Sequence, residues 1–242
     1  MDLKKFYDIE GQRSDVWTED RRSNKFFQEI IRYDRILKRL PSRSTLGEMV
    51  ADLGCGDGYL THLIEQRGFK IVSVDISESR LEKLRKKLDN RRVSLLLADL
   101  SNTALSSNQF DYVVMSEVLE HIVQFEAVIS EVYRILKPGG FFILTVPYNE
   151  KIRNVTCPHC FHAFNPDGHV NSFNRENLAH ALDQRGFQVH EIKTFRSRVT
   201  NQLQYHLKIP YGRLISLLDA FFVALKPEFT FYMLIRAQKP NN

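Results

Sequence analysis

Three glycines stand together where an apolar run ends and an amphipathic pattern begins. Gly54, Gly56 and Gly58 follow residues 49–53 and precede the helical pattern of residues 59–68. Glycine lets a backbone approach a ligand closely, because it has no side chain and tolerates unusual dihedral angles. The spacing G-x-G-x-G differs from the G-x-G-x-x-G that places a pyrophosphate at a helix N-terminus. The turn therefore predicts a ligand site and fits a dinucleotide poorly.

An acidic residue stands at the end of each of three consecutive apolar runs. Asp52 comes just before the glycine turn, where a carboxylate suits the ammonium group of a ligand. Asp75 ends the second run, where it can accept hydrogen bonds from both hydroxyls of a ribose. Asp99 ends the third run and is placed to contact an adenine amine. Each acid alone is as readily a turn or cap residue, but together with the glycines they predict a nucleoside site.

Cys157 and Cys160 form a C-x-x-C step, which often supplies half of a tetrahedral zinc site. No second C-x-x-C follows, so histidines would have to complete the set. The predicted zinc ligands are Cys157, Cys160, His162 and His169. The alternative is a reduced thiol pair in a substrate-binding loop, since the spacing is incomplete.

Catalytic candidates follow the fourth and fifth apolar runs. Tyr148 and His169 are candidate general bases, since both are expected to face the pocket. His121 is a third candidate and forms an E-x-x-E-H pattern with Glu117 and Glu120. Two carboxylates and an imidazole suit a hard or borderline divalent cation, but they are also ordinary residues at a helix N-terminus.

Short apolar runs alternate with amphipathic patterns from residue 49 onward, which is typical of βα units in a parallel sheet. Strands are predicted at residues 49–53, 70–75, 93–100, 110–117, 141–147, 187–195 and 229–238. Helices are predicted at residues 59–68, 77–90, 126–140 and 175–186, with Ser77 as an N-cap. The predicted fold class is α/β, with a doubly wound, seven-stranded, mostly parallel sheet.

A single domain is predicted. Its parts are a helical lead-in (1–45), a ligand-binding core (46–195), a helical insertion (196–228) and a last strand with a tail (229–242). Residues 148–172 show little periodicity and are expected to form a long functional loop. The apolar helix 214–225 in the insertion is interpreted as a core helix, with an acceptor pocket or a membrane surface as alternatives. Residues of the lead-in that could cover a ligand or bind acidic groups are Tyr7, Trp17, Arg21 and Arg22.

Length and composition fit one large α/β domain, with 242 residues, 43% hydrophobic and 26% charged. The net charge of +5 weakly favours anionic partners, although the basic cluster from Arg80 to Lys87 is expected to be a solvated helix face. Three cysteines give no disulfide framework and the N-terminus lacks an apolar stretch, so a cytoplasmic location is expected. Residues 214–225 are interrupted by Asp219 and are too short to span a membrane.

Five segments resemble the successive motifs of class I S-adenosylmethionine-dependent methyltransferases, namely VADLGCGDG, SVDIS, LLLADL, FDYVVMSEVLEHI and RILKPGGFFILTVP. The similarity covers residues 50–187 and is to the branch that includes ubiquinone-pathway and other small-molecule enzymes. It implies the strand order 3-2-1-4-5-7-6, with an antiparallel last strand. The residues that it implies as cofactor contacts are Asp52, Gly54, Cys55, Gly56, Gly58, Asp75, Ile76, Asp99, Leu100 and Ser116.

The E-x-x-E-H spacing is similar to the metal site of two subfamilies of these enzymes. Quinone-pathway O-methyltransferases and small-RNA 2′-O-methyltransferases use a divalent metal to hold acceptor hydroxyls. His169 stands where the RNA enzymes carry their remaining histidine. The same pattern is common in enzymes of this branch without a metal, so both interpretations stay open.

The leading hypothesis is a cytoplasmic enzyme that transfers a methyl group from S-adenosylmethionine to an oxygen or nitrogen of a small molecule, which is expected to be anionic or partly apolar. A first alternative is a metal-dependent RNA ribose 2′-O-methyltransferase, which the absence of a separate RNA-binding domain disfavours. A second is a cofactor-binding module without catalysis. Zinc or another divalent metal is the second expected cofactor, and the oligomeric state is left open.

Overall fold

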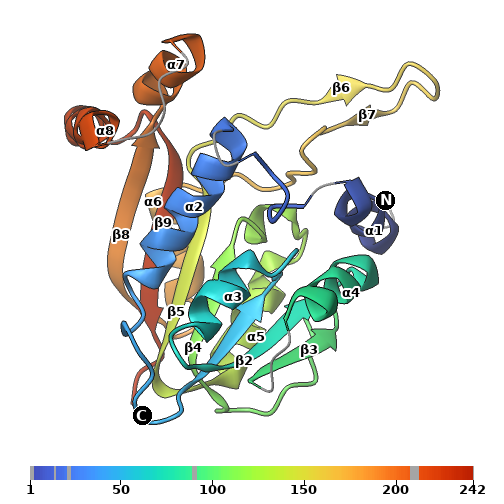
Figure 1. Cartoon of the computed structure of the whole chain (residues 1–242), viewed down its shortest axis with the longest axis vertical. Coiled ribbons are helices and arrows are strands. Elements are labelled where there is room, and N and C mark those ends of the chain that lie inside the picture. Colours follow the sequence, from blue (N-terminus) through green and yellow to red (C-terminus); the bar gives the residue numbers. More distant parts are fainter. Residues whose placement is uncertain (1–2, 14, 21–22, 89–91, 208–212, 242) are drawn as a thin grey trace.

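A seven-stranded sheet forms the centre of the computed structural model, which describes residues 3–13, 15–20, 23–88, 92–207 and 213–241 (Figure 1). Its strands are β1 (Met49–Leu53), β2 (Lys70–Asp75), β3 (Val93–Leu97), β4 (Phe110–Ser116), β5 (Leu136–Pro147), β8 (Gln188–Ser197) and β9 (Thr230–Gln238). They lie in the order β3-β2-β1-β4-β5-β9-β8. Strand β9 is antiparallel to both β5 and β8, whereas β1 to β5 are parallel. The predicted fold class and strand order are confirmed.

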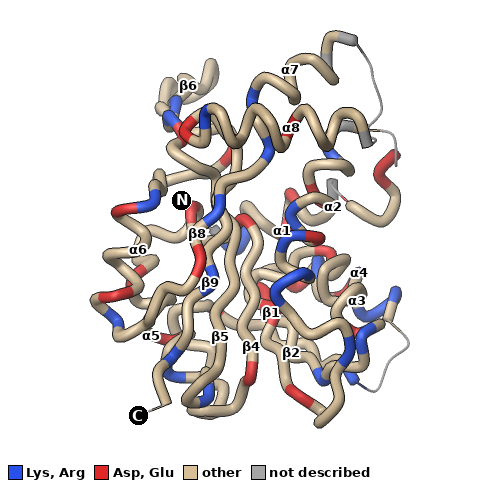
Figure 2. Tube along the Cα trace, turned by 90° about the vertical axis from the view of Figure 1, so that its left-hand side faces the viewer, with Lys and Arg blue, Asp and Glu red and all other residues tan. Residues whose placement is uncertain are grey.

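Helices cover both faces of this sheet (Figure 2). They are α1 (Leu3–Arg13), α2 (Asn24–Leu37), α3 (Tyr59–Glu65), α4 (Glu78–Lys87), α5 (Phe125–Ile135), α6 (Arg175–Asp183), α7 (Arg198–Leu207) and α8 (Arg213–Leu225), with a short 3-10 helix η1 (Leu119–His121) after β4. Helices α2 and α3 lie on one face, and α5 and α6 lie on the other. Ser77 is the N-cap of α4 as predicted, because its side chain accepts a hydrogen bond from the backbone N–H of Arg80.

The core consists of two apolar layers that the sheet separates. On one side, Val128 and Val132 of α5 pack in a buried cluster with Phe142 of β5. On the other, Ile36 of α2 and Ile64 of α3 belong to a second buried cluster. Strands buried on both faces must be apolar throughout, which is why these runs were legible in the sequence.

The helix expected at residues 126–140 is shorter than predicted. Helix α5 ends at Ile135, and β5 already begins at Leu136, which pairs with Phe110 of β4. Pro138 explains the early end, because proline has no N–H and disfavours helical dihedrals at the residue before it. The third strand is also shorter than expected, so Asp99 lies two residues beyond β3.

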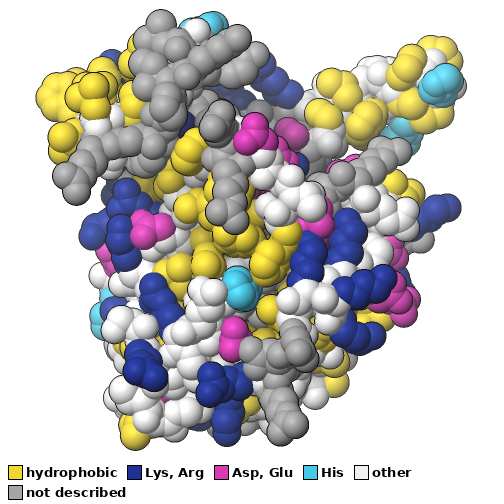
Figure 3. All heavy atoms as spheres, viewed as in Figure 1, with side chains coloured by type: hydrophobic (Ala, Val, Ile, Leu, Met, Phe, Trp, Pro, Cys, Tyr) yellow, Lys and Arg dark blue, Asp and Glu magenta, His cyan; other side chains and the backbone are white. Residues whose placement is uncertain are grey.

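Residues 148–172 contain a hairpin where the sequence predicted a loop. Strands β6 (Val155–Thr156) and β7 (Ala163–Phe164) form a separate two-stranded sheet that projects from the molecule (Figure 1). Helices α7 and α8 form the insertion before β9. The interpretation of residues 214–225 as a core helix is wrong, because Leu214, Leu217, Phe221 and Leu225 of α8 are exposed, and hydrophobic side chains show on the surface of the insertion (Figure 3). None of the described helices is both long and apolar enough to cross a membrane.

Candidate functional site

Two cavities meet at the carboxyl ends of the strands, and Glu117 and His121 line both of them. The small cavity has a volume of about 200 Å³ and the large cavity of about 790 Å³. The small cavity lies beyond the ends of β1 to β4, where doubly wound sheets bind their ligands. Its described walls are formed by Tyr7, Gly54, Asp75, Ile76, Arg80, Asp99, Leu100, Glu117, Val118, His121 and Ile122.

Glycine is required at two positions of the turn between β1 and α3. Gly54 and Gly58 have φ angles of +71° and +75°, which L side chains rarely adopt. A Cβ on Gly54 would lie 2.5 Å from Val118, and a Cβ on Gly58 would lie 2.2 Å from Leu84. The glycines therefore let the turn lie directly against its neighbours, with Gly54 in the wall of the small cavity.

Asp75 presents a fixed carboxylate to the small cavity. It accepts hydrogen bonds from the backbone N–H of Gly56 at 2.8 Å and of Ser77 at 2.9 Å. Burial raises the pKa of this carboxyl, and the hydrogen bonds oppose that shift only in part. The carboxylate has acceptor capacity left, so it is suited to bind two vicinal hydroxyls of a ligand. Asp99 lies in the same wall and accepts a 2.8 Å hydrogen bond from the backbone N–H of Ser101.

Five of the predicted cofactor residues lie beside the small cavity, outside its described walls: Asp52, Cys55, Gly56, Gly58 and Ser116. The Asp52 carboxylate is buried and accepts a 2.6 Å hydrogen bond from Thr61. Burial raises its pKa to about 7, although that hydrogen bond favours the ionised form. Cys55 packs against Leu81 and Leu84, and burial raises the pKa of its thiol.

Arg80 is a cavity residue that the sequence interpretation missed. It was assigned to a solvated helix face, yet its side chain lines the small cavity. The reason is the N-cap Ser77, which starts α4 immediately after β2 and turns the first helical turn toward the ligand site. The signal in the sequence was the position of Arg80 in the first turn of the helix, three residues after the capping Ser77.

Tyr7 reaches the small cavity from α1, outside the sheet. Asp8 accepts hydrogen bonds from the Ser77 hydroxyl at 2.7 Å and the Ser79 backbone N–H at 3.3 Å, which holds α1 on the start of α4. The Tyr7 ring lies edge-on to His121, with centroids 5.7 Å apart. Its hydroxyl is buried without a hydrogen-bond partner among the described residues, and burial raises its pKa. Tyr7 is therefore placed to donate a hydrogen bond to a bound ligand.

Among the other lead-in candidates, Trp17 is described by the structure and lines neither cavity. Trp17 donates a 2.7 Å hydrogen bond to the carbonyl of Asp57 and packs edge-on against Tyr59, so its role is structural. Arg21 and Arg22 lie outside the described residues.

A group of potential metal ligands lies where the two cavities meet. In the part of the chain that the structure describes, Glu120, His121 and His169 are the one group of three whose ligand atoms lie within 4.8 Å of one another. Four polar atoms here are buried without a hydrogen-bond partner among the described residues: Glu117 Oε1, both carboxylate oxygens of Glu120, and His121 Nδ1. Such atoms are rare, because each costs about 1–3 kcal/mol when left unpaired. Carboxylate and imidazole donors fit a hard or borderline divalent cation.

Burial shifts the pKa values of these acids and imidazoles in opposite directions. It raises the pKa of Glu117 to about 7 and, together with the charge of Glu117, also raises that of Glu120. Burial and the neighbouring His169 lower the pKa of His121 to about 4. Burial also lowers the pKa of His169, but a 2.5 Å hydrogen bond to Glu150 outweighs it, so the pKa is raised. A bound cation would favour the ionised carboxylates and reverse the shifts of both acids.

The backbone after β4 brings these side chains together. Glu117 has a φ of +54°, which is uncommon for a residue other than glycine and turns the chain sharply out of the strand. The backbone N–H groups of Val170 and Asn171 donate to the carbonyl of Glu120 at 2.9 and 3.0 Å. These hydrogen bonds fix the segment that carries His169 against η1.

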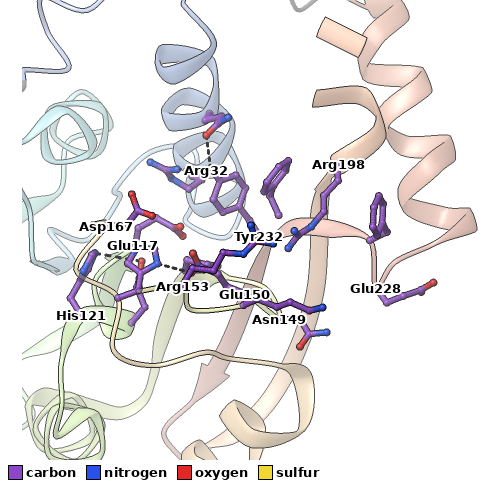
Figure 4. A pocket seen from close by; sticks show the side chains of 17 residues that line it. Arg32, Glu117, His121, Asn149, Glu150, Arg153, Asp167, Arg198, Glu228 and Tyr232 are labelled. Carbon is purple, nitrogen blue, oxygen red and sulfur yellow. Dashed lines mark hydrogen bonds and ion pairs between the residues drawn. The ribbon is translucent and has the colours of Figure 1, made fainter. Parts of the chain in front are cut away.

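The large cavity extends from this group to a wall of cationic and aromatic side chains (Figure 4). The basic residues in the wall are Arg32, Lys151, Arg153 and Arg198. Arg32 forms a 2.6 Å ion pair with Glu29 and donates a 3.1 Å hydrogen bond to the hydroxyl of Tyr232. Arg198 lies 5.0 Å from the centroid of the Phe231 ring. The wall also contains the carboxylates of Glu150, Asp167 and Glu228, so charges of both signs and aromatic faces line the large cavity.

The prediction that Tyr148 faces the pocket is wrong. Its side chain is buried in the core cluster that includes Phe173 and Leu178. The flanking residues Pro147 and Asn149 line the large cavity instead. Successive side chains of an extended chain point to opposite sides, so only the neighbours of Tyr148 can face the cavity.

The structure does not bring the four predicted zinc ligands together. Cys157, Cys160 and His162 lie at the turn of the β6–β7 hairpin, and the cysteines are free. His169 lies with Glu120 and His121 at the meeting point of the cavities. The extended hairpin separates the two sites, and the spacing of cysteines and histidines in the sequence carried no sign of it.

Comparison with known proteins agrees with this arrangement. A family model described as a methyltransferase domain matches residues 24–192. A probable S-adenosylmethionine-dependent methyltransferase of Mycolicibacterium smegmatis is 29% identical over 160 residues, which are 66% of this chain and 59% of that protein. A ubiquinone biosynthesis O-methyltransferase of Pseudomonas entomophila is 34% identical over 112 residues, 45% of this chain and 48% of its own length. The chain thus spans about half the length of the curated relatives that it matches.

A solved structure shares the fold over nearly the whole chain. The [4+2]-cyclase SpnF superposes with a TM-score of 0.72 at 19% identity, over 99% of this chain and 96% of the other. At that identity the similarity shows the fold alone.

Proposed function

The chain belongs to the family of methyltransferase domains, and we propose that it transfers the methyl group of S-adenosylmethionine to a hydroxyl oxygen of an acceptor bound in the large cavity. The observation that carries this proposal is that Glu117 and His121 line both cavities. A cofactor in one cavity and an acceptor in the other would meet at these side chains. Methyl transfer needs mainly such in-line placement of donor and acceptor.

The small cavity is the proposed cofactor site. Asp75 would accept hydrogen bonds from the ribose hydroxyls, and Asp99 would contact the adenine amine. Tyr7 would donate its free hydroxyl hydrogen to the cofactor and exclude water from above. Asp52, which is bonded to Thr61 below the glycine turn, would favour the ammonium end of the methionine at that turn.

The residues at the meeting point fit a divalent cation, as their four unpaired buried atoms indicate. Glu117, Glu120, His121 and His169 would hold it, and when bound it would supply positive charge that lowers the pKa of an acceptor hydroxyl. Glu150 accepts the hydrogen bond from Nδ1 of His169, so Nε2 is the nitrogen that would bind the cation, with loss of its proton to solvent where the raised pKa keeps it protonated. The acceptor oxygen then forms its bond to the methyl carbon as the bond from sulfur to that carbon breaks. The hydroxyl proton leaves to solvent.

Calorimetric titration of S-adenosylhomocysteine into the purified protein tests the cofactor site directly. Micromolar binding is expected, and Asp75→Ala should weaken it by about 2–5 kcal/mol, the loss typical of a charge-assisted pair. Asp34→Ala is a matched control, because Asp34 pairs with Lys38 on the surface of α2, away from both cavities. Absence of binding to the parent protein would refute the proposal, and equal affinity in the Asp75 variant would refute the ribose assignment.

The terminal ribose of an RNA is a second candidate acceptor. It is supported by the proximity of Glu120, His121 and His169, and by the basic side chains of the large cavity. Figure 2 shows Lys and Arg interspersed with Asp and Glu along the chain, which gives RNA no continuous basic track in that view. Incubation with labelled S-adenosylmethionine and short RNAs, with and without a chelator, tests whether RNA or a small molecule is the acceptor. Chelator-sensitive label on RNA would favour this acceptor over a small molecule.

A further inference from the structure

The C-x-x-C step lies at the turn of the projecting β6–β7 hairpin. Val155 pairs with Phe164 and Thr156 pairs with Ala163. The next position in this register places Cys157 opposite His162, and the backbone N–H of Cys157 donates to the carbonyl of His162 at 2.9 Å. Opposite residues of a hairpin present their side chains on the same face.

The turn itself surrounds the sulfur of Cys157 with hydrogen-bond donors. The backbone N–H groups of His159 and Cys160 donate to this sulfur, and the Cys160 thiol also interacts with it. The backbone N–H of Phe161 donates to the carbonyl of Cys157 at 2.9 Å, and Phe161 has a φ of +55°. The strained conformation at Phe161 reverses the chain so that both sulfurs lie on one turn. Amide donors stabilise a thiolate, which is the form that binds metals.

We propose that the hairpin turn binds one zinc ion through the thiolates of Cys157 and Cys160 and the imidazole of His162. Two sulfurs and one nitrogen are a donor set that zinc prefers, and water completes the tetrahedron. Each thiol releases its proton to solvent as zinc binds. His162 is exposed and lies opposite Cys157 in the hairpin, so its side chain is free to rotate; zinc binding would require that rotation, because the three ligand atoms do not lie within 4.8 Å of one another in the ion-free turn. This site is separate from the one at Glu120, His121 and His169.

The proposed ion would fix the arm that carries part of the large cavity. Lys151 and Arg153 lie on the segment that enters the hairpin, and Asp167 and His169 lie on the segment that leaves it. One described hydrogen bond between these segments runs from the Asn165 side-chain amide to the carbonyl of Arg153 at 3.1 Å. Zinc at the turn would therefore restrict the separation of the two segments at their far end.

Cobalt(II) titration of the reduced, metal-free protein tests this site without an activity assay. Sulfur-to-cobalt charge-transfer absorption reports thiolate ligands alone, so cobalt bound by carboxylates and imidazoles elsewhere does not contribute. One equivalent per chain is expected to give this absorption, and zinc is expected to abolish it by displacement. Cys160→Ser should weaken cobalt binding and lower the absorption per bound ion, because the Cys157 thiolate alone remains, and His162→Gln should weaken cobalt binding at least tenfold. His180→Gln, on the exposed side of α6, is the matched control and should bind as the parent does.

Three results would overturn the proposal. One is a parent protein without charge-transfer absorption. Another is unchanged affinity in His162→Gln, which would remove the histidine from the ligand set. The third is half an equivalent of cobalt together with a chelator-sensitive dimer, which would place the site between two copies. Circular dichroism and S-adenosylhomocysteine titration of each variant establish that the fold is retained.

Discussion

The imidazole rings of His121 and His169 lie edge to face, with their centroids 4.7 Å apart. At this distance their two positive charges would repel, and a proton on one ring disfavours a proton on the other. Burial and this repulsion keep His121 neutral at pH 7, since its pKa is about 4. His121 therefore keeps a nitrogen that can bind a cation at pH 7. The charge of the neighbouring carboxyls of Glu117 and Glu120 depends on pH.

We expect the cation-free protein to lose stability as the pH rises from about 4.5 to about 7. Burial raises the pKa of Glu117 from its usual 4.5 to about 7 in the folded protein, so the folded state keeps a proton that the unfolded state releases in this range. A raised pKa stabilises the fold below the unfolded value, and that contribution is lost as the pH passes the folded value. The shifts of Glu120 and Asp52 have the same sign, and together these carboxyls outweigh His121, whose lowered pKa adds stability as the pH rises from about 4 to 6.5. Thermal unfolding in a chelator between about pH 5 and 8 measures the effect.

The Glu117→Gln variant tests whether the carboxyl of Glu117 causes this pH dependence of stability. It should be more stable than the parent near pH 8 in a chelator, by about 1–3 kcal/mol, because a buried charge is removed. Excess Mg²⁺ or Mn²⁺ should stabilise the parent and leave the variant largely unchanged. A parent whose stability rises with pH in the absence of cations would contradict the assignment.

Alanine at Gly58 should destabilise the protein more than alanine at Gly47. Both glycines have nearly the same φ, +75° and +74°, so both substitutions carry the same backbone strain. A Cβ at Gly58 meets Leu84 at 2.2 Å, whereas nothing lies within 4 Å of a Cβ at Gly47. We expect an additional loss of roughly 1–3 kcal/mol at Gly58, the usual cost of overpacking. Chemical denaturation of both variants gives the difference, and equal losses would remove steric contact as the cause.

Tyr7→Phe should separate folding from ligand binding. The hydroxyl is buried without a described partner, so its removal should leave the free energy of unfolding unchanged or raise it by up to about 1 kcal/mol. If the hydroxyl donates to the cofactor, affinity for S-adenosylhomocysteine should fall about 5- to 20-fold, the value of one hydrogen bond. Calorimetry and thermal unfolding of the same sample test both parts. Unchanged affinity would mean that the hydroxyl does not contact the ligand.

The ion pair between Arg39 and Glu191 should stabilise the protein at neutral pH and not in acid. Arg39 donates two hydrogen bonds to Glu191, at 3.0 and 2.7 Å, and these lower the pKa of that carboxyl to about 2. A lowered pKa contributes stability above the unfolded value of 4.5 that is lost as the pH falls toward 2. Glu191→Gln should therefore cost about 1 kcal/mol near pH 7 and almost nothing near pH 2. Urea unfolding of the parent and the variant at both pH values measures this cost. An equal difference in the free energy of unfolding at both pH values would exclude the charge of Glu191 as its source.

The sheet could be predicted because its strands are buried on both faces. Segments such as 49–53 and 70–75 are mostly apolar and have an acid at or next to their last residue, which makes both their extent and their carboxyl ends recognisable. Strands of parallel sheets place those ends together, so the small cavity followed from the order of the motifs. The helix predicted at residues 126–140 extends too far, because Pro138 disfavours helical dihedrals at the residue before it.

The rest of the site depends on contacts that no local pattern encodes. Tyr7 enters the small cavity because Asp8 bonds to Ser77 and Ser79, about seventy residues later in the chain. His169 does not lie with Cys157 and Cys160, because those cysteines are at the turn of the β6–β7 hairpin. Hydrogen bonds to the carbonyl of Glu120 fix the segment that contains His169. Such long-range pairings are set by tertiary packing. The candidate residues could therefore be predicted from the sequence, but the residues that they contact could not.

The docking of α1 on α4 has a kinetic consequence for whatever occupies the small cavity. Tyr7 lines that cavity, and the described hydrogen bonds between α1 and the start of α4 run from Ser77, Ser79 and Lys83 to Asp8 and to the carbonyl of Gly11. A short helix that docks on the outside of the sheet and its helices opens more often than the sheet itself unfolds. We expect the residence time of a ligand there to depend on how often α1 departs, so exchange can be fast without any loss in the precision of the bound geometry.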